Sequence, residues 1–314
     1  MEKLPFIEDC GLMLEPQEGM RVDEIVGWAN YAEKSGYGYI FRSDHLLPTS
    51  GPEKRLPSPE CWVTLGAVAA STNRIKFGPM VSPVGFRNPA VLANIACTLY
   101  SFSHGRAILS VGAGWYKSEY EAYGLKFPEL DERKEAFYEA LQIIAPLAAG
   151  KRVSFKGKHY TADVECFPKP DPKIHLVVGG RDSQIIRWTA EFADELNMYS
   201  PSKKQVSKAK RILSEQSKPG KVVLSQMAPF FIGESDTDLR KRVQKYLDEN
   251  GLKMKVEDQM AEFKESGIVC GTPSDFITQV KDKRASGLER FYFQLYDPSD
   301  RAAAEILTST LRKI

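Results

Sequence analysis

The chain has few residues of the kinds that bind metals or build disulfide frameworks. Its cysteines are odd in number, five in all, lie far apart and form no CxxC pair. Its four histidines are isolated from one another and show no HExxH or similar ligand spacing. A disulfide framework is therefore excluded as the basis of the fold, and we expect no structural or catalytic metal.

An excess of charge and long apolar runs are also missing. The net charge is only +2, which argues against nucleic acid or an anionic membrane as the main partner. No apolar run approaches the roughly 20 residues of a membrane span. The first residues, MEKLPFIEDCG, lack the apolar segment of a signal peptide. We expect a cytoplasmic protein that acts on a small-molecule substrate.

Short buried-strand patterns alternate with helical patterns along the 314 residues. Nearly every strand pattern is followed by a helix, and this order predicts an α/β fold, a single (β/α)8 TIM barrel forming one domain over residues 1–314. Residues 153–167 alternate and turn at Lys156-Gly157, which predicts an inserted hairpin. Residues 235–267 form an extra helical insertion before the last strand. The predicted strands are 10–14, 37–41, 75–81, 107–110, 174–178, 195–199, a part of 222–232, and 291–295.

Closely spaced glycines follow the fourth strand. Gly112 and Gly114 precede Trp115, and a strand that ends in glycines lets a flat ligand approach the backbone, because no Cβ stands in the way. A simple tight turn is the alternative. Lys117 stands where a dinucleotide fingerprint needs a small residue, so a Rossmann site is not supported.

The active site of a barrel of this kind forms just beyond the carboxyl ends of its strands. We therefore expect a ligand site where glycines, arginines, a tryptophan and an Asp-His pair converge. The strand ends in question hold Asp44 and His45, residues 81–87, 112–119, 179–181 and 197–200.

Several of these segments resemble one protein family when taken in order. The chain resembles the luciferase-like flavin and deazaflavin oxidoreductases over roughly residues 11–295, and within them the coenzyme F420-dependent oxidoreductases. The segments that carry the resemblance are SDH at 43–45, IKFGPMV at 75–81 with FRNPA at 86–90, SHGR at 103–106, GAGW at 112–115 with Glu119, and VGG at 178–180 with Ala193-Asp194.

The resemblance implies a barrel that holds F420 or FMN at its carboxyl-terminal face, often as a homodimer. It also implies a non-prolyl cis peptide bond behind the cofactor ring, which falls at Met80-Val81 in this chain; an ordinary trans strand is the alternative. The cofactor-binding residues that the resemblance implies are Met80, Val81, Ser82, Gly112, Gly114, Ser118, Val178, Gly179, Gly180 and Arg181.

His45 is the leading candidate for proton handling, since the reference pKa of histidine lies near 6.5. Asp44 would orient it or contact the edge of the cofactor ring; an exposed loop histidine is the alternative. Trp115 stands where the F420-dependent sugar-phosphate dehydrogenase pattern carries a glutamate, and we expect it to form an aromatic wall of the substrate pocket. Glu119, one helical turn on, is the candidate to replace that glutamate.

A phosphate group is expected beside Gly179, Gly180 and Arg181, just before a helix that starts near Ser183. A helix N-terminus attracts anions, and an arginine adds charge-assisted hydrogen bonds. A solvated surface arginine is the alternative. F420 carries a lactyl-oligoglutamate tail, for which the candidate rim residues are Arg42, Arg87, Arg181 and Arg187.

Three functions remain open on the sequence. The first is an F420-dependent oxidoreductase that moves a hydride between the deazaflavin and a small organic substrate. The second is an FMN-dependent monooxygenase that receives reduced flavin from a separate flavin reductase. The third is a flavin-binding protein without turnover. FMN and F420 share a tricyclic ring and a ribityl phosphate, so the subgroup resemblance alone favours F420.

Overall fold

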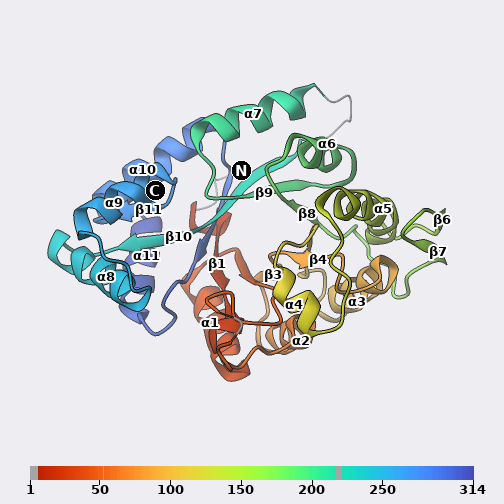
Figure 1. Cartoon of the computed structure of the whole chain (residues 1–314), viewed down its shortest axis with the longest axis horizontal. Coiled ribbons are helices and arrows are strands. Elements are labelled where there is room, and N and C mark those ends of the chain that lie inside the picture. Colours follow the sequence, from red (N-terminus) through yellow and green to blue (C-terminus); the bar gives the residue numbers. More distant parts are fainter. Residues whose placement is uncertain (1–5, 52, 216–220) are drawn as a thin grey trace.

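The computed structural model describes residues 6–51, 53–215 and 221–314, and its centre is a parallel sheet (Figure 1). The eight predicted strands are all present, shifted by at most two residues at most ends. They are β1 (Cys10–Leu14), β2 (Tyr39–Arg42), β3 (Lys76–Pro79), β5 (Leu109–Gly112), β8 (Leu176–Gly179), β9 (Glu195–Tyr199), β10 (Val223–Ile232) and β12 (Arg290–Gln294).

The sheet curls into a nearly closed barrel. Its order is β3-β2-β1-β12-β10-β9-β8-β5, with the short strand β4 (Ser82–Pro83) paired to β5. The ends meet where the amide of Ile108 donates to the carbonyl of Phe77 at 2.8 Å. The predicted strand 75–81 is shorter than expected and ends at Pro79, and the cis peptide bond Met80-Val81 lies between β3 and β4. That bond lies where the resemblance implies it.

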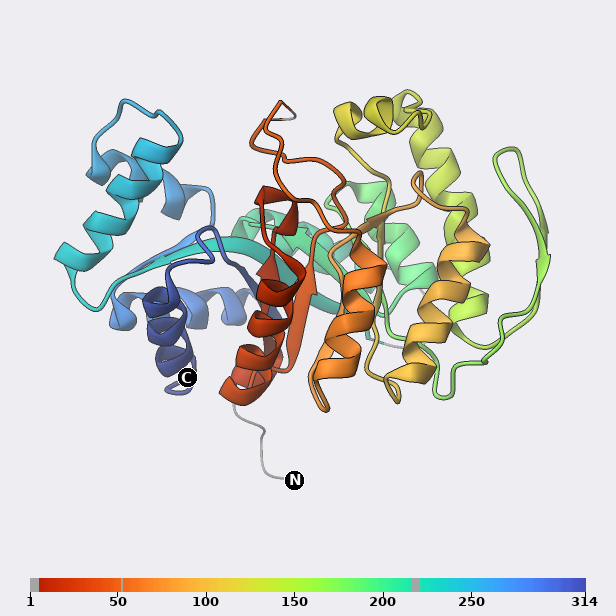
Figure 2. The same cartoon turned by 90° about the horizontal axis from the view of Figure 1, so that it is seen from below.

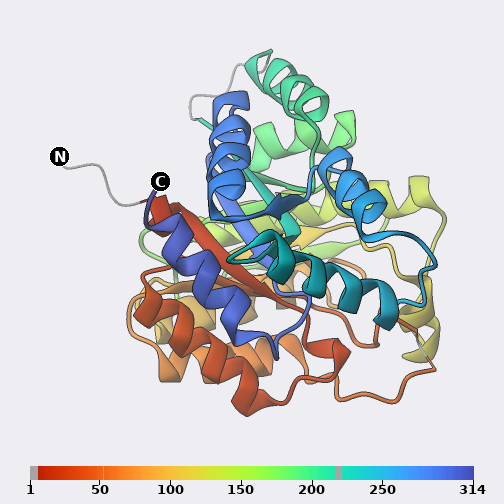
Figure 3. The same ribbon diagram turned by 90° about the vertical axis from the view of Figure 1, so that its left-hand side faces the viewer.

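Helices cover the outside of the sheet. Side chains cap two of these helices at their N-termini: the Asn88 side chain accepts from the amide of Ala90, and Thr272 forms a capping box with Asp275. The first and last helices lie side by side (Figure 3), joined by a 3.0 Å hydrogen bond between Tyr31 and Thr308. The helices are α1 (Val22–Ser35), α2 (Cys61–Ser71), α3 (Pro89–Phe102), α4 (Lys117–Ala122), α5 (Leu130–Ala148), α6 (Ser183–Phe192), α7 (Lys203–Ser214), α8 (Asp236–Glu249), α9 (Val256–Glu265), α10 (Pro273–Ser286) and α11 (Arg301–Leu311), with 3-10 turns at Phe6–Asp9 and Pro16–Glu18.

Two additions extend the barrel, as predicted. The hairpin of β6 (Val153–Lys156) and β7 (Thr161–Val164) projects from one side (Figure 2). Helices α8 and α9 form the insertion before the last strand and are followed by β11 (Val269–Gly271), a three-residue strand paired with β10 that the sequence did not predict. This insertion has a small core of its own, made by Phe231, Leu239, Val243, Phe263 and Cys270.

The barrel interior is packed rather than hollow. Side chains alternate along each strand, so one set faces the helices and the other faces the barrel axis. The inward set separates the two ends of the barrel, and its apolar members are Met13, Tyr39, Phe41, Met80, Ile108, Val177 and Tyr292.

Within the described part of the chain, no helix is both long and apolar enough to cross a membrane. The five cysteines are buried and unpaired. The same residues contain no group of three or more His, Cys, Asp or Glu side chains arranged to hold a metal ion.

Candidate active site at the barrel mouth

The segments that follow the strands gather at one end of the barrel, which we call the mouth. In Figure 2 the loop between β2 and α2, the helix α4 and the α8–α9 pair lie along the upper edge. This arrangement brings His45, Val81, Gly112 and Gly179 to the same end of the sheet.

His45 is held by Glu119 from α4. His45 Nδ1 lies 3.0 Å from Glu119 Oε1, and the backbone amide of Leu46 donates to Glu119 Oε2 at 2.9 Å. Glu119 is almost completely buried, whereas 16% of the His45 side chain is exposed. The carboxylate thus fixes the ring through Nδ1 and leaves Nε2 for a ligand.

Two opposing effects act on the His45 pKa. Burial is the largest and lowers the pKa, because it disfavours the charged imidazolium. The hydrogen bond and charge of Glu119, with smaller contributions from Glu15 and Asp44, outweigh burial and raise the pKa above its ordinary value. His45 therefore accepts a proton more readily than a free imidazole.

Asp44 does not take the orienting role that the sequence suggested. Its buried carboxylate receives two hydrogen bonds from Arg87, at 2.7 and 3.1 Å, and one from Ser82 Oγ at 2.5 Å. Trp62 Nε1 donates to the same Ser82 hydroxyl at 3.1 Å. Burial, the largest influence, raises the pKa of Asp44, and the Arg87 charge opposes that rise. This network ties β2 to the segment after the cis bond and braces the loop that carries His45.

An aromatic wall stands beside the histidine. The His45 and Trp115 ring centroids are 5.5 Å apart and nearly perpendicular, and Trp115 stacks on Tyr116 at 5.2 Å. Trp115 is 65% exposed, so it forms an open edge of the site rather than part of a core. The Tyr116 hydroxyl donates to the carbonyl of Pro48 at 3.0 Å and fixes the wall to the neighbouring loop.

Val81 and two glycines form an apolar floor at the mouth. A Cβ on Gly112 would lie 2.7 Å from Val81 Cγ2, and one on Gly179 would lie 2.9 Å from Val81 Cγ1. These distances are too short for side chains, so glycine is required at both positions. Gly114 has φ of +80°, a backbone conformation that also favours glycine. The backbone of both glycines therefore approaches Val81 closely on the side of the mouth.

The segment before α6, where we expect a phosphate group to bind, agrees only in part with the prediction. Gly180 and the exposed Arg181 precede α6, but the N-cap of that helix is Asp182, whose side chain accepts from the amide of Gln184 at 2.9 Å. A carboxylate already occupies part of the helix N-terminus. The attraction for a phosphate therefore depends more on Arg181 and less on the helix than the sequence indicated.

Four predicted cofactor residues have different surroundings. Met80 packs inside the barrel, Ser82 is bound to Asp44, and the Val178 side chain belongs to the core under the helices. Ser118 is half-buried on α4, beside Tyr116. Only the backbone of the first three positions is available to a ligand at the mouth.

Two of the four rim arginines are not available for a cofactor tail. Arg42 is buried and donates to the carbonyls of Ser43 and Pro59 and to the Thr64 hydroxyl. Arg87 is committed to Asp44 and Glu60. Arg181 and Arg187 are exposed.

A polar cluster at the mouth was missed from the sequence. Glu15, just after β1, accepts hydrogen bonds from Gln17 and from Gln294 of β12, both at 2.7 Å. Burial is the main reason that the pKa of Glu15 is raised. The carboxylate of Glu15 in turn raises the pKa values of His45 and Tyr199 through its charge. The alternation of side chains along β1 could have revealed this cluster in the sequence. Because Met13 faces the barrel axis, Glu15 faces it too.

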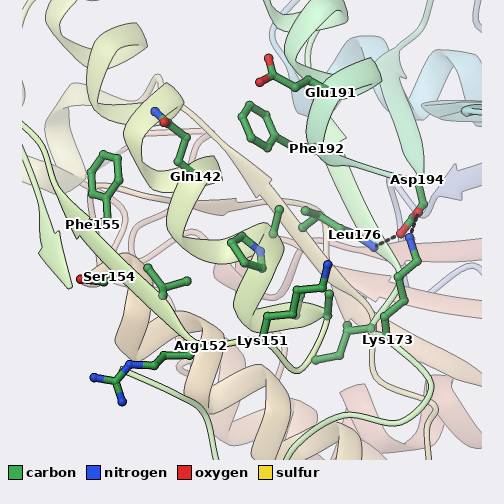
Figure 4. A pocket seen from close by; sticks show the side chains of 16 residues that line it. Gln142, Lys151, Arg152, Ser154, Phe155, Lys173, Leu176, Glu191, Phe192 and Asp194 are labelled. Carbon is green, nitrogen blue, oxygen red and sulfur yellow. Dashed lines mark hydrogen bonds and ion pairs between the residues drawn. The ribbon is translucent and has the colours of Figure 1, made fainter. Parts of the chain in front are cut away.

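One sizeable cavity lies away from the mouth. It has a volume of about 630 Å³ and runs between the end of α5, the strand β6 and the helix α6 (Figure 4). None of the predicted site residues lines it, and its charged side chains belong to Lys151, Arg152, Lys173, Glu191 and Asp194. The geometry of the mouth, and not the size of this cavity, identifies the candidate active site.

The chain belongs to the family of luciferase-like monooxygenases, since the family model matches residues 6–290. It is thus a member of an oxidoreductase enzyme family.

Two individual proteins that are similar to this chain are F420-dependent dehydrogenases. An F420-dependent glucose-6-phosphate dehydrogenase from Microbacterium testaceum (strain StLB037) is 33% identical over 174 residues, which cover 55% of this chain and 51% of the relative. An F420-dependent hydroxymycolic acid dehydrogenase from Mycobacterium tuberculosis (strain ATCC 25618 / H37Rv) is 31% identical over 200 residues, which cover 60% and 54%. The chain thus matches about half the length of these curated relatives.

The fold has a close counterpart among solved structures. An F420-dependent secondary alcohol dehydrogenase in complex with an F420-acetone adduct aligns with a TM-score of 0.79 at 20% identity, covering 96% of this chain and 97% of the other. The shared fold is a nearly closed parallel barrel.

Proposed function

We propose that the protein is an F420-dependent oxidoreductase that moves a hydride between the deazaflavin and an alcohol or carbonyl group of a small organic substrate. The observation that carries the proposal is the pair of His45 and buried Glu119 beside the glycine floor. The similarity to two F420-dependent dehydrogenases supports the choice of cofactor.

The residues at the mouth fit a planar ring with a phosphate. The Val81 side chain and the glycine backbone at 112 and 179 offer a flat apolar surface, and Arg181 offers exposed donors for an anion. F420 supplies hydride transfer when it is bound.

His45 handles the proton that accompanies the hydride. Its Nδ1 donates to Glu119, which leaves the Nε2 lone pair to accept the proton of a substrate hydroxyl as a carbonyl forms. The imidazolium that results is stabilised by the carboxylate behind it. In the opposite direction, the same nitrogen donates the proton to the carbonyl oxygen.

The substrate differs from a sugar phosphate in this proposal. Trp115 occupies the position where the sugar-phosphate dehydrogenase pattern has a glutamate, and an indole cannot deliver a proton. The centre of its exposed ring lies 5.5 Å from the centre of the His45 ring. The indole instead offers an apolar surface to the body of the substrate.

The test is a titration of the purified protein with F420 and with FMN, each oxidised and reduced. Tight binding of F420 alone supports the proposal. A preference for reduced FMN supports a two-component monooxygenase, which would need a flavin reductase, and binding of neither contradicts both.

A substitution of His45 distinguishes an enzyme from a protein that only stores the cofactor. His45→Ala is expected to leave the F420 dissociation constant within about threefold and to lower kcat by about 10²–10⁴, as expected for loss of a general base. Arg181→Ala is the matched control and should weaken F420 binding instead. An equal loss of affinity in both variants would make His45 a binding residue, and a wild-type protein without turnover on a panel of alcohols and ketones would favour a storage protein.

A further inference from the structure

A second cavity lies at the end of the barrel opposite the mouth, where the strands begin. Its volume is about 210 Å³, and the inward cluster around Phe41 and Tyr292 separates it from the candidate active site. Residues at the starts of five barrel strands contribute to it. It is lined by Tyr39, Lys76, Tyr100, Gly105, Arg106, Ala107, Ile108, Pro172, Lys173, His175 and Arg290.

The lining of this cavity is basic. It includes Lys76, Arg106, Lys173 and Arg290, together with His175, and none of the described lining residues carries a carboxylate. Four cationic side chains around one small volume repel each other unless anions balance them.

Two of these charges are balanced from outside the cavity. Buried Glu195 pairs with Arg290 and lies 2.9 Å from His175 Nε2. Lys173 pairs with Asp194, the ion pair drawn as a dashed line in Figure 4. The second oxygen of Glu195 accepts a hydrogen bond from the Tyr292 hydroxyl, and that of Asp194 accepts one from the amide of Leu176, so neither forms an ion pair with Lys76 or Arg106.

The other two charges have only neutral partners. Arg106 donates to the carbonyls of Ser103 and Ala69 and to the Thr72 hydroxyl. Lys76 is exposed to solvent, its Nζ stands 5.8 Å from the centre of the Tyr39 ring, and none of the ion pairs among the described residues includes it. Burial lowers the pKa of Lys76 and the Arg290 charge lowers it further, while the charge of Glu195 opposes both effects without cancelling them.

We propose that this cavity binds a small, multiply charged oxyanion of the phosphate class, with Lys76 and Arg290 as the main contacts. An anion here would give Lys76 and Arg106 a direct ionic partner, since Glu195 and Glu33 influence their charges without an ion pair to either side chain. A water molecule occupies about 30 Å³ of liquid, so the cavity has room for a phosphate group with several waters or for a small phosphorylated molecule.

The alternative is an ion-pair network that only stabilises the start of the strands, since this end of such barrels serves stability. In that case phosphate and chloride would affect the protein equally.

The test is an isothermal titration with inorganic phosphate, at an ionic strength held constant with chloride, followed by thermal unfolding under the same conditions. We expect saturable phosphate binding and a rise in Tm that chloride does not give. Lys76→Met should weaken the binding about tenfold or more, which corresponds to about 1.4 kcal/mol. Lys253→Met, an exposed lysine elsewhere, should have no effect.

Arg181→Ala distinguishes this cavity from the mouth. Phosphate binding that survives in Arg181→Ala and is lost in Lys76→Met supports the proposal. Binding that is lost in Arg181→Ala and kept in Lys76→Met would place the anion at the mouth and overturn it, as would the absence of any phosphate-specific binding. Lys76→Gln, which keeps a polar side chain, serves if the methionine variant does not fold.

Discussion

His45 and Glu119 are 74 residues apart in the chain, yet the ring nitrogen and the carboxylate oxygen lie 3.0 Å apart at the barrel mouth. The partnership exists because α4 follows β5 directly and returns its buried face to the loop after β2.

This pair makes stability depend on pH. Because the folded-state pKa of His45 is raised, its protonation stabilises the fold fully at pH values below the unfolded pKa, near 6.5, and this contribution is lost as pH rises through the folded pKa. Glu119→Gln should remove that dependence. Urea unfolding across this range measures it, with Glu135→Gln, which removes an exposed carboxylate next to His159, as control. Parallel curves for wild type and Glu119→Gln would refute the coupling.

The Asp44 network predicts a large loss of stability from a small change. Asp44→Asn leaves Arg87 without its buried counter-charge and should lower the free energy of unfolding by about 3–5 kcal/mol. Asp23→Asn breaks an exposed ion pair with Arg21 and should change little. Urea denaturation measures the free energy of unfolding of both variants. Equal losses in the two variants would mean that Asp44 is not ionised in the folded protein.

The floor of the mouth predicts an effect on the cofactor. Gly112→Ala places a methyl group 2.7 Å from Val81 Cγ2, so it should cost about 1–3 kcal/mol of stability and weaken F420 binding. Gly27→Ala is the control: it lies within α1, where the added Cβ meets its nearest atom at 3.9 Å, and should stabilise by about 0.5–1 kcal/mol. Unchanged F420 titration in Gly112→Ala would remove Val81 from the floor.

Exposed apolar side chains on α2 and α3 predict self-association. Val63 is 74% exposed and Val91 is 54% exposed on these neighbouring helices. We propose that they meet a second copy of the chain in a homodimer, because both are exposed apolar side chains on helices that contact each other. Light scattering should give a dimer for the wild type and a monomer for Val63→Glu combined with Val91→Glu. A monomeric wild type would refute the proposal.

The position of the site could be predicted from the sequence, but its pairings could not. The strand β2, which ends at Arg42, delivers His45 to the mouth, as expected. Neighbouring residues at a strand end point in different directions, so Asp44 meets Ser82 and Arg87 while His45 meets Glu119. Sequence proximity therefore suggested the wrong carboxylate for the histidine.

Alternation could have found one more part of the site. Glu15 continues the inward positions of β1, and Gln294 holds the matching place on β12 beside Met13. By contrast, the three residues of β11 carry no pattern long enough to distinguish a strand from a loop.

The separate core of the α8–α9 insertion has a further consequence. Phe231 and Phe263 stack at 4.3 Å beside Tyr246, and these rings belong to a cluster distinct from the one under the barrel helices. Substitutions and length changes in residues 235–267 can accumulate there without disturbing the barrel strands. Descendants of this chain can thus reshape one border of the mouth while they inherit the floor of Val81 and the two glycines unchanged.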